Sequence, residues 1–226
     1  PSTRIMPSVG FKAGEILVAK GELQKAAERF SKVRENPLAG PDDKDKAMFA
    51  LAELDYFQGS FDSALVKLKV LLSNLSADIA NDALMLQEFI KEHRTGNPLG
   101  LKEYARAELL ERQRKLSEAK VVLEQLIANS RNSPIVDDGL LKVGRLETKI
   151  GDVRRALSTY EKLIVEHPES ILRDKAQLSI GEIYEYYLKE NQKAISAYQT
   201  LLENYPNSLF LDEARKRIRR LRGDVL

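Results

Sequence analysis

Residues 150–207 contain the same sequence pattern twice. An alanine, Ala156 or Ala194, is followed by a tyrosine four residues later, a leucine seven residues later and a proline twelve residues later. The two copies are 38 residues apart. A period of this length is typical of stacked repeats, in which each unit contacts only its neighbours. The chain is therefore predicted to be a repeat array rather than a domain built around one central core.

The alanine of this pattern, which we call the anchor, recurs upstream, so the repeat covers most of the 226 residues. Successive anchors are separated by 38, 55, 37 and 38 residues. An apolar residue follows each anchor by four and by seven residues, and these offsets place all three residues on one face of a helix. The anchors are Ala26, Ala64, Ala119, Ala156 and Ala194.

Each anchor is preceded by a turn position and by a second small residue, which we call the notch residue. The turn positions, five residues before the anchors, are Gly21, Gly59, Arg114, Gly151 and Lys189. Glycine at such a position tolerates the left-handed conformation that often ends a helix. The notch residues, seven residues before the turn or eight in the last unit, are Gly14, Ala52, Ala107, Gly144 and Gly181. Each unit is predicted to be a helical hairpin whose two small residues face each other and let the helices approach closely.

This combination of small residues, turn, aromatic ring and closing proline resembles the tetratricopeptide repeat. The residues that carry the resemblance are Gly144, Gly151, Ala156, Tyr160 and Pro168. Two features depart from the family pattern, because the period is 37 or 38 residues instead of about 34 and the chain has no tryptophan. The resemblance implies an all-α fold, a right-handed α-solenoid of helical hairpins. Longer units of this kind are similar to bacterial cell-envelope members of the family, which favours the periplasm or the outer membrane, with the cytoplasm as the alternative.

The repeat spacing also predicts how the chain is divided. The separation of 55 residues between the second and third anchors exceeds the usual period by about one helix, and residues 78–93 carry an apolar stripe that supplies it. The breaker-rich residues 94–100 are expected to form a loop, and the repeats to resume at Leu101. The predicted segments are two hairpins at 1–75, an inserted helix and loop at 76–100, three hairpins at 101–208, and a basic capping helix with a tail at 209–226.

No catalytic, cofactor or metal site is predicted. The chain has no cysteine, and its two histidines, His93 and His167, lie near expected helix ends, where the helix dipole favours them. Phosphate-binding glycine loops, paired-histidine metal spacing and nucleophile elbows are missing from the sequence. The carboxylates fall on exposed helix faces at salt-bridge spacing. The expected function is therefore not enzymatic and involves no small-molecule substrate.

Bulk properties narrow the class of partner. The net charge is only +2, so a globally basic nucleic-acid binder is not indicated, and no apolar run reaches the length of a membrane span. The chain begins at Pro1, and we expect a mature product or a fragment. Asn74-Leu75-Ser76 and Arg222-Gly223-Asp224 spell a glycosylation sequon and an integrin-type tripeptide, and neither is given functional weight.

A binding site is predicted on the first helix of the hairpins. In the family that the chain resembles, the positions three before and one after the notch residue tend to line a concave groove that receives peptides. The groove residues predicted in this way are Phe11, Glu15, Phe49, Glu53, Tyr104, Glu108, Arg145 and Glu182. Four glutamates in a row of five charged positions would repel an acidic peptide, so the expected partner is a basic or neutral protein or peptide. The alternative interpretation is that the aromatic rings pack between hairpins and the glutamates are solvated.

The last predicted helix carries a basic patch, which consists of Arg215, Lys216, Arg219 and Arg220. A solenoid needs a terminal element with a polar outer face, and this capping role is the main interpretation. Contact with an acidic surface, with anionic lipid at the membrane periphery or with nucleic acid is the alternative, and the lack of interleaved aromatic residues disfavours nucleic acid.

The predicted function is that of a scaffold holding a partner protein or peptide along a preformed groove, because a groove that is ordered in advance lowers the entropic cost of binding. Two alternatives remain open. The chain could be a self-assembly module that forms a homodimer through the inserted helix and the loop at 96–100. It could also be a regulatory domain of a larger bacterial protein whose active part lies outside this sequence.

Overall fold

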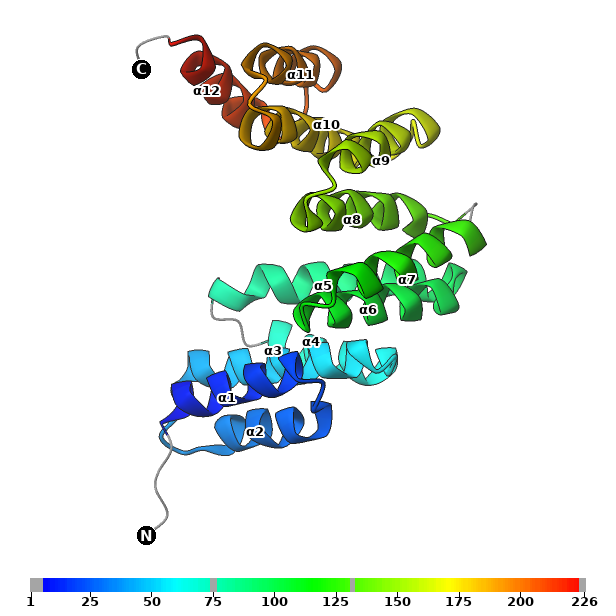
Figure 1. Cartoon of the computed structure of the whole chain (residues 1–226). Helices are drawn as coiled ribbons and strands as arrows, with labels where there is room; N and C mark the ends of the chain where they lie inside the picture. Colours follow the sequence, from blue (N-terminus) through cyan, green and yellow to red (C-terminus); the bar gives the residue numbers. More distant parts are fainter. Residues whose placement is uncertain (1–5, 74–76, 131–132, 224–226) are drawn as a thin grey trace. The chain divides into compact units, whose positions relative to one another are not determined.

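The computed structural model describes residues 6–73, 77–130 and 133–223. In these residues the chain forms twelve α-helices and one π-helix without a β-strand (Figure 1). The fold is an all-α helical-repeat solenoid, as the resemblance implied. None of the described helices has the length and apolar character needed to cross a membrane. The sequon at 74–76 and Asp224 of the tripeptide lie outside the described residues.

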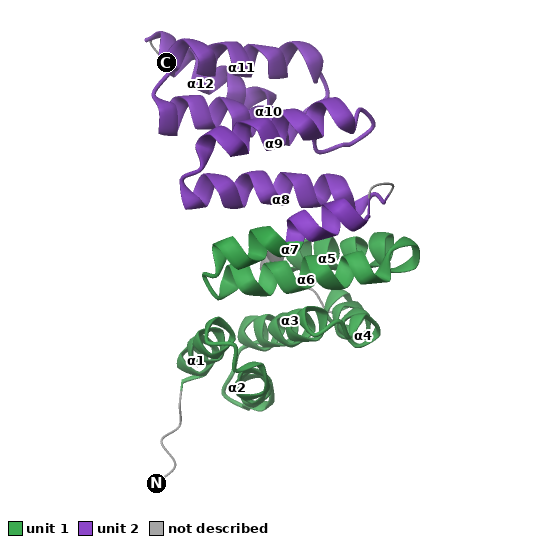
Figure 2. Cartoon of the chain, turned by 45° about the vertical axis from the view of Figure 1, so that its right-hand side comes forward, with its two compact units in different colours: residues 1–122 green, residues 123–226 purple. Residues whose placement is uncertain are grey.

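The helices follow one another through short connections. Their bounds are α1 Pro7–Ala19, α2 Leu23–Glu35, α3 Pro41–Phe57, α4 Phe61–Leu72, α5 Ala77–Gly96, α6 Pro98–Arg112, α7 Leu116–Asn129, α8 Ile135–Ile150, α9 Val153–Glu166, α10 Arg173–Glu182, η1 Ile183–Leu188, α11 Asn191–Asn204 and α12 Leu211–Arg222. The chain divides into two compact units, residues 1–122 and residues 123–226, with the boundary inside α7 (Figure 2).

All five predicted turn positions adopt the left-handed conformation. The φ angles are 81° at Gly21, 76° at Gly59, 61° at Arg114, 94° at Gly151 and 57° at Lys189. The turn prediction is therefore confirmed, and it holds even where a side chain makes this conformation unfavourable. The hairpin geometry is strong enough to impose it on an arginine and a lysine.

Three of the notch residues receive an aromatic ring. A Cβ atom added at the glycine would lie 2.4 Å from the ring for Gly14 with Phe30, 2.6 Å for Gly144 with Tyr160 and 2.2 Å for Gly181 with Tyr198. The ring four residues after the anchor therefore fills the notch, and that the two small residues face each other stays a prediction. Where the notch residue is an alanine, the residue four after the anchor is a leucine: Ala52 is matched with Leu68 and Ala107 with Leu123. A glycine at the notch is thus matched with a large aromatic ring four residues after the anchor, and the larger alanine is matched with the smaller leucine.

The predicted inserted helix is observed as α5, in which Ala83 and Ile90 are wholly buried and Ile79 and Leu86 on the same face are half-buried. The predicted loop at 94–100 is wrong, because only Asn97 separates α5 from α6. The Asn97 side chain accepts a hydrogen bond from the backbone N–H of Gly100 at 2.9 Å, and Pro98 occupies the first helical position, where a missing N–H costs nothing. Breaker residues therefore marked a helix boundary correctly without indicating the length of the connection.

The sixth helix takes an unusual course in unit 1, because it packs against both α1 and α3. The side chain of Lys102 lies beside Gly59 in the turn between α3 and α4, and the side chain of Gln113 lies beside Gly21 in the turn between α1 and α2. Helix α6 therefore spans both hairpin turns. This course brings its last residue, Arg112, to the space between α1 and α3.

In the last repeat, eight residues instead of seven lead from the notch residue Gly181 to the turn residue Lys189, and the π-helix η1 lies between them. A π-helix has a wider turn than an α-helix and accommodates one extra residue. The π-helix follows α10 directly and ends at Leu188, immediately before the turn residue Lys189. It buries the side chain of Glu185 and leaves Tyr186 and Tyr187 exposed. The spacing was evident in the sequence, but the π-helix was not predicted from it.

The last helix, α12, closes unit 2. It packs against α11 and buries Ala214 and Ile218 in a core shared with Tyr198 and Leu201. The predicted capping helix at 209–221 is thus observed at Leu211–Arg222. Its apolar stripe is fully used in this packing.

Candidate functional site

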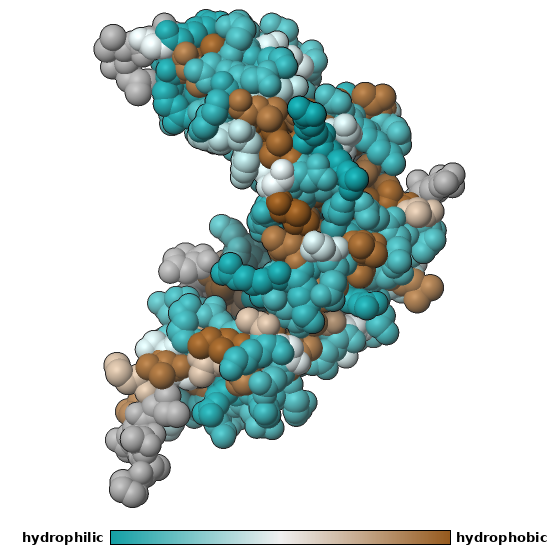
Figure 3. Space-filling model, in the orientation of Figure 1, coloured by the Kyte–Doolittle hydropathy of each residue, from teal (hydrophilic) through white to brown (hydrophobic). Residues whose placement is uncertain are grey.

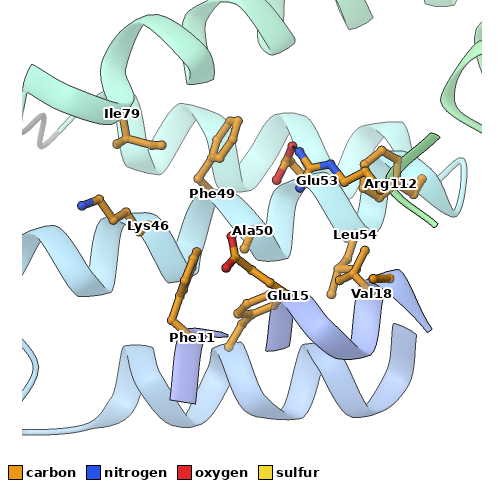
Figure 4. A pocket seen from close by; sticks show the side chains of 13 residues that line it. Phe11, Glu15, Val18, Lys46, Phe49, Ala50, Glu53, Leu54, Ile79 and Arg112 are labelled. Atoms are coloured by element: carbon orange, nitrogen blue, oxygen red, sulfur yellow. Dashed lines mark hydrogen bonds and ion pairs between the residues drawn. The ribbon is translucent and has the colours of Figure 1, made fainter. Parts of the chain in front are cut away.

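Four of the predicted groove residues line one cavity in unit 1. Phe11 and Glu15 come from α1, and Phe49 and Glu53 come from α3 (Figure 4). The cavity has a volume of about 230 Å³. Because the two helices belong to successive hairpins, the repeat itself places these four side chains together.

Apolar side chains form most of the cavity wall. The rings of Phe11 and Phe30 lie 5.2 Å apart between centroids with an angle of 49° between planes. In Figure 3 hydrophobic residues gather over α1 and α3 among hydrophilic neighbours. The other apolar residues of the wall are Val18, Ala19, Ala50, Leu54, Phe57 and Ile79, the last from α5. A mostly apolar cavity with a few convergent polar groups is the usual character of a binding site.

An ion pair between Glu53 and Arg112 lies in the wall of the cavity. The Glu53 side chain is only 16% exposed, whereas that of Arg112 is 48% exposed. The guanidinium also lies over the ring of Phe57, 5.4 Å from its centroid. Burial raises the pKa of Glu53 to about 7; Arg112 opposes this shift and the neighbouring carboxylate of Glu108 adds to it.

The two other charged residues of the cavity are more exposed than Glu53. The carboxylate of Glu15 pairs with Lys12 on the same helix at 2.6 Å, and the Glu15 side chain is 41% exposed. Lys46 is exposed and makes no ion pair within the described residues. The rim of the cavity thus carries one charge of each sign.

Two predicted groove residues of unit 1 lie outside the cavity. Tyr104 is 8% exposed, and its ring centroid is 4.9 Å from that of Phe89 on α5. Glu108 accepts a hydrogen bond from the hydroxyl of Tyr56 at 2.9 Å. The inserted helix therefore covers one groove position, and an internal contact engages the other.

The remaining predicted groove residues, Arg145 and Glu182, belong to unit 2. Arg145 is exposed on α8. Glu182 forms an ion pair with Arg217 of α12 at 2.9 Å. Burial raises the pKa of Glu182, and Arg217 acts against this shift. Glu182, like Glu53, is thus already paired with an arginine of its own chain, and the repulsion expected from four glutamates is reduced.

The predicted basic patch is only partly available. Arg215 pairs with Asp212 at 3.0 Å. Arg220 pairs with Glu185 and donates a hydrogen bond to the hydroxyl of Tyr186 at 2.8 Å. Lys216 and Arg219 are exposed and make no ion pair in the described part of the chain.

Arg217 was not singled out by sequence reasoning, yet it has the most contacts of the basic residues in α12. Its side chain is 13% exposed and pairs with Glu182, with Glu185 at 3.5 Å and with Glu213 at 2.7 Å. It also donates to the hydroxyl of Tyr198, which in turn donates to Glu185 at 2.7 Å. Its place three residues after Ala214, at the edge of the apolar stripe, was the signal that could have identified it.

Burial and the hydrogen bond to Glu185 raise the pKa of Tyr198 well above its usual range. The hydroxyl therefore stays protonated and acts as a donor. It fixes the buried carboxylate beneath α12, and this polar cluster serves to attach the capping helix to α10 and η1.

A second cavity, of about 570 Å³, lies in unit 2 and contains none of the predicted groove residues. It is lined by residues of α7, α8 and α9, together with His167. The hydroxyl of Thr159 donates a hydrogen bond to Glu147 there at 2.7 Å. Of the two predicted helix-end histidines, His167 follows α9 directly, and His93 lies buried in the last turn of α5. Among the described residues, no three or more histidine, cysteine or acidic side chains are grouped as a metal site.

Comparison with solved structures finds helical-repeat proteins at low identity. They include the human IFIT1 dimer with m7Gppp-AAAA (16% identity, 96% of this chain and 46% of that chain, TM-score 0.44). A thermophilic tetratricopeptide repeat protein of Thermus thermophilus matches at 18% identity over 96% and 98% of the chains, with a TM-score of 0.40. A structure of nearly identical tetratricopeptide-like repeats, described as those of a kinesin light chain of Podospora anserina, matches at 16% identity. The match covers 90% of this chain and 100% of that chain, with a TM-score of 0.43. The chain spans about half the length of the human protein.

No curated protein matches the chain in sequence. The family model of the tetratricopeptide repeat, however, matches residues 138–170 and 175–208. The first match covers α8 and α9, and the second covers α10, η1 and α11. These are the two hairpins in which the sequence pattern is clearest. These two hairpins of the chain are therefore tetratricopeptide repeats.

Proposed function

We propose that the chain is a non-enzymatic scaffold that holds a partner protein or peptide, and that the cavity in unit 1 is the anchoring point. Stacked hairpins present preformed surfaces, and their usual use is the binding of other proteins. One observation carries the proposal. Phe11, Glu15, Phe49 and Glu53, which the repeat pattern marks as groove positions, line the same cavity.

The size and chemistry of the cavity favour one apolar side chain as the anchor. A volume of about 230 Å³ is enough for a single large side chain, and binding energy is commonly concentrated in such a buried anchor. The charges of an ionised Glu53 and Arg112 offset each other in the wall of the cavity. The opposite charges of Glu15 and Lys46 at the rim do not favour a strongly charged peptide. The proposed partner segment is therefore neutral or moderately basic, with one aromatic or long aliphatic residue.

Selection of peptides from a random library on the intact chain tests this function. The selected peptides should share one large apolar residue, and Phe49→Ala should weaken their binding at least about tenfold. Tyr187→Ala is the matched control, since Tyr187 is exposed on η1 in unit 2. Undiminished binding by Phe49→Ala, with melting temperatures showing both variants folded, would exclude the cavity as the anchor. Selection of acidic tails at about pH 8, where Glu53 is ionised, would contradict the proposed partner class.

Self-assembly is a second candidate function, because α5 carries apolar side chains on its outer face. Leu84 is 48% exposed and Met85 is 71% exposed. Deleting residues 76–99 is an unsuitable test, since it would also remove the buried Ala83 and Ile90. Met85→Lys is a cleaner one. A dimer mass in light scattering that becomes a monomer mass in this variant would support self-assembly, and a monomeric parent chain would exclude it.

A further inference from the structure

We propose that the Glu53–Arg112 pair makes the cavity a proton-controlled site: with Glu53 ionised it takes a neutral apolar anchor, and with Glu53 protonated it also takes an anchor that bears a carboxylate. This inference rests on the proposed function of the cavity. It concerns the charge of the anchor, whereas the proposed function concerns only its apolar part.

The arrangement of charged groups supports the inference. Glu53 is a largely buried carboxylate in the wall of the cavity, with 16% of its side chain exposed, and its ion-pair partner, Arg112, is half exposed. More carboxylates than cations surround this wall. The charged groups that face the cavity or act on Glu53 are Arg112 and Glu108 on α6, Asp82 on α5, Glu15 on α1 and Lys46 on α3.

The charge of Glu53 is the one that changes near neutrality. Burial raises its pKa to about 7, Arg112 counteracts the shift, and Glu108 and Asp82 reinforce it. The guanidinium of Arg112 is a permanent cation in proteins. Its position over the ring of Phe57 holds it at the wall. Protonation of Glu53 therefore leaves the cavity in place and adds one positive charge to it.

Protonation also changes the hydrogen bonds that the wall can offer. An ionised Glu53 accepts a hydrogen bond from one guanidinium nitrogen of Arg112, and its negative charge would repel a second carboxylate. A protonated Glu53 leaves the positive charge of the guanidinium to the ligand and can itself donate one hydrogen bond. Linkage then requires that a carboxylate ligand favour the protonated form, so its binding near neutral pH takes up a proton.

Three small probes that share a phenyl ring and differ in the head group test the inference on the full chain. They are 3-phenylpropionate, 2-phenylethanol and phenethylamine, and the two ionisable probes keep their charge between about pH 6 and about pH 8. Binding is measured by NMR shifts of the cavity phenylalanines. We expect 3-phenylpropionate to bind about fivefold to tenfold more tightly at the lower pH. The alcohol should bind equally at both values, and the amine should gain nothing at the lower one.

Two variants identify the group responsible. In Glu53→Gln, 3-phenylpropionate should bind as tightly at the higher pH as it does to the parent chain at the lower pH. In the control Glu88→Gln, on the exposed surface of α5, the pH dependence should persist. Calorimetry of 3-phenylpropionate binding in two buffers of different ionisation enthalpy should show that the parent chain takes up a proton on binding and that Glu53→Gln does not.

The outcomes separate this inference from the proposed function. If 2-phenylethanol binds but the affinity for 3-phenylpropionate does not depend on pH, the proton control is wrong and the anchoring cavity stands. The same conclusion follows if the pH dependence survives in a folded Glu53→Gln variant. If none of the three probes binds at either pH, the cavity is not an anchor and both proposals fail.

Discussion

Tyr198 covers Gly181 so closely that a Cβ atom on residue 181 would lie 2.2 Å from the tyrosine ring. The ring is wholly buried, and its hydroxyl is held by Glu185 at 2.7 Å. The ring therefore has no room to move away. The same relationship joins Gly14 to Phe30, which has no hydroxyl group, and this pair offers the simplest test of the packing.

Gly14→Ala should destabilise unit 1 even though alanine is the better helix former. The gain in helix propensity is about 1 kcal/mol, whereas overpacking a buried site costs about 1 to 3 kcal/mol. We expect a net loss of about 1 kcal/mol in urea unfolding. Adding Phe30→Leu to this variant should recover much of the lost stability, since other repeats combine an alanine at the notch with a leucine four residues after the anchor. Strictly additive effects of the two substitutions would contradict the size matching.

Arg217→Ala should cost far more stability than Arg219→Ala. The first removes a cation from the buried carboxylate of Glu185 and from Glu182, and we expect a loss of about 2 to 4 kcal/mol. The second removes an exposed side chain with no ion pair among the described residues and should change stability by less than about 0.5 kcal/mol. Thermal unfolding of the two variants at one pH makes the comparison. Equal losses would show that α12 is not attached through Arg217.

Glu53→Gln should change how stability depends on pH. The pKa of Glu53 is about 7 in the folded chain against 4.5 as the ordinary value, so between these values the folded chain holds a proton that the unfolded chain has released. Stability of the parent chain should therefore fall as pH rises through this window and level off above it. At about pH 8 the variant should be more stable by about 1 to 3 kcal/mol, and at about pH 4 nearly equal. A less stable variant at the higher pH would mean that the ion pair with Arg112 outweighs the cost of burial.

Lys189→Gly should stabilise the chain. Lys189 has a φ angle of 57°, and a side chain in this conformation costs roughly 1 to 2 kcal/mol, part of which the flexibility of glycine in the unfolded chain cancels. We expect a gain of about 0.5 to 1 kcal/mol in denaturant unfolding. Gly151→Ala should instead destabilise the chain, because the backbone of residue 151 has a φ angle of 94°. A loss of stability in Lys189→Gly would show that contacts of the lysine side chain outweigh the backbone cost.

The hairpins could be predicted because their information is local. An anchor such as Ala156 and its neighbours at four and seven residues define one helix face without reference to the rest of the chain. The turns were predictable for the same reason, since Gly151 marks a backbone requirement that the hairpin also imposes on Lys189. The hairpin pattern could be extended to the other repeats from the spacing of the anchors alone.

The parts that could not be predicted depend on contacts between distant residues. Nothing near Arg112 in the sequence indicates that α6 crosses two hairpin turns and brings this side chain to Glu53. The burial of Glu53, and with it the raised pKa, follows from that course. The contact between Phe89 and Tyr104 likewise depends on where the inserted helix packs. Four of the predicted groove residues meet in the cavity because they belong to successive repeats, whereas Tyr104 packs against the inserted helix and Glu182 pairs with the capping helix.

The inserted helix has a practical consequence for dissecting this chain. Repeat proteins are commonly treated as interchangeable modules that can be cut between hairpins. A fragment ending after α4 would retain Phe11 and Phe49 but lose Ile79 of α5 and Arg112 of α6. The smallest piece that contains every wall of the cavity therefore extends through α6, and a shorter excision would yield hairpins without the pocket.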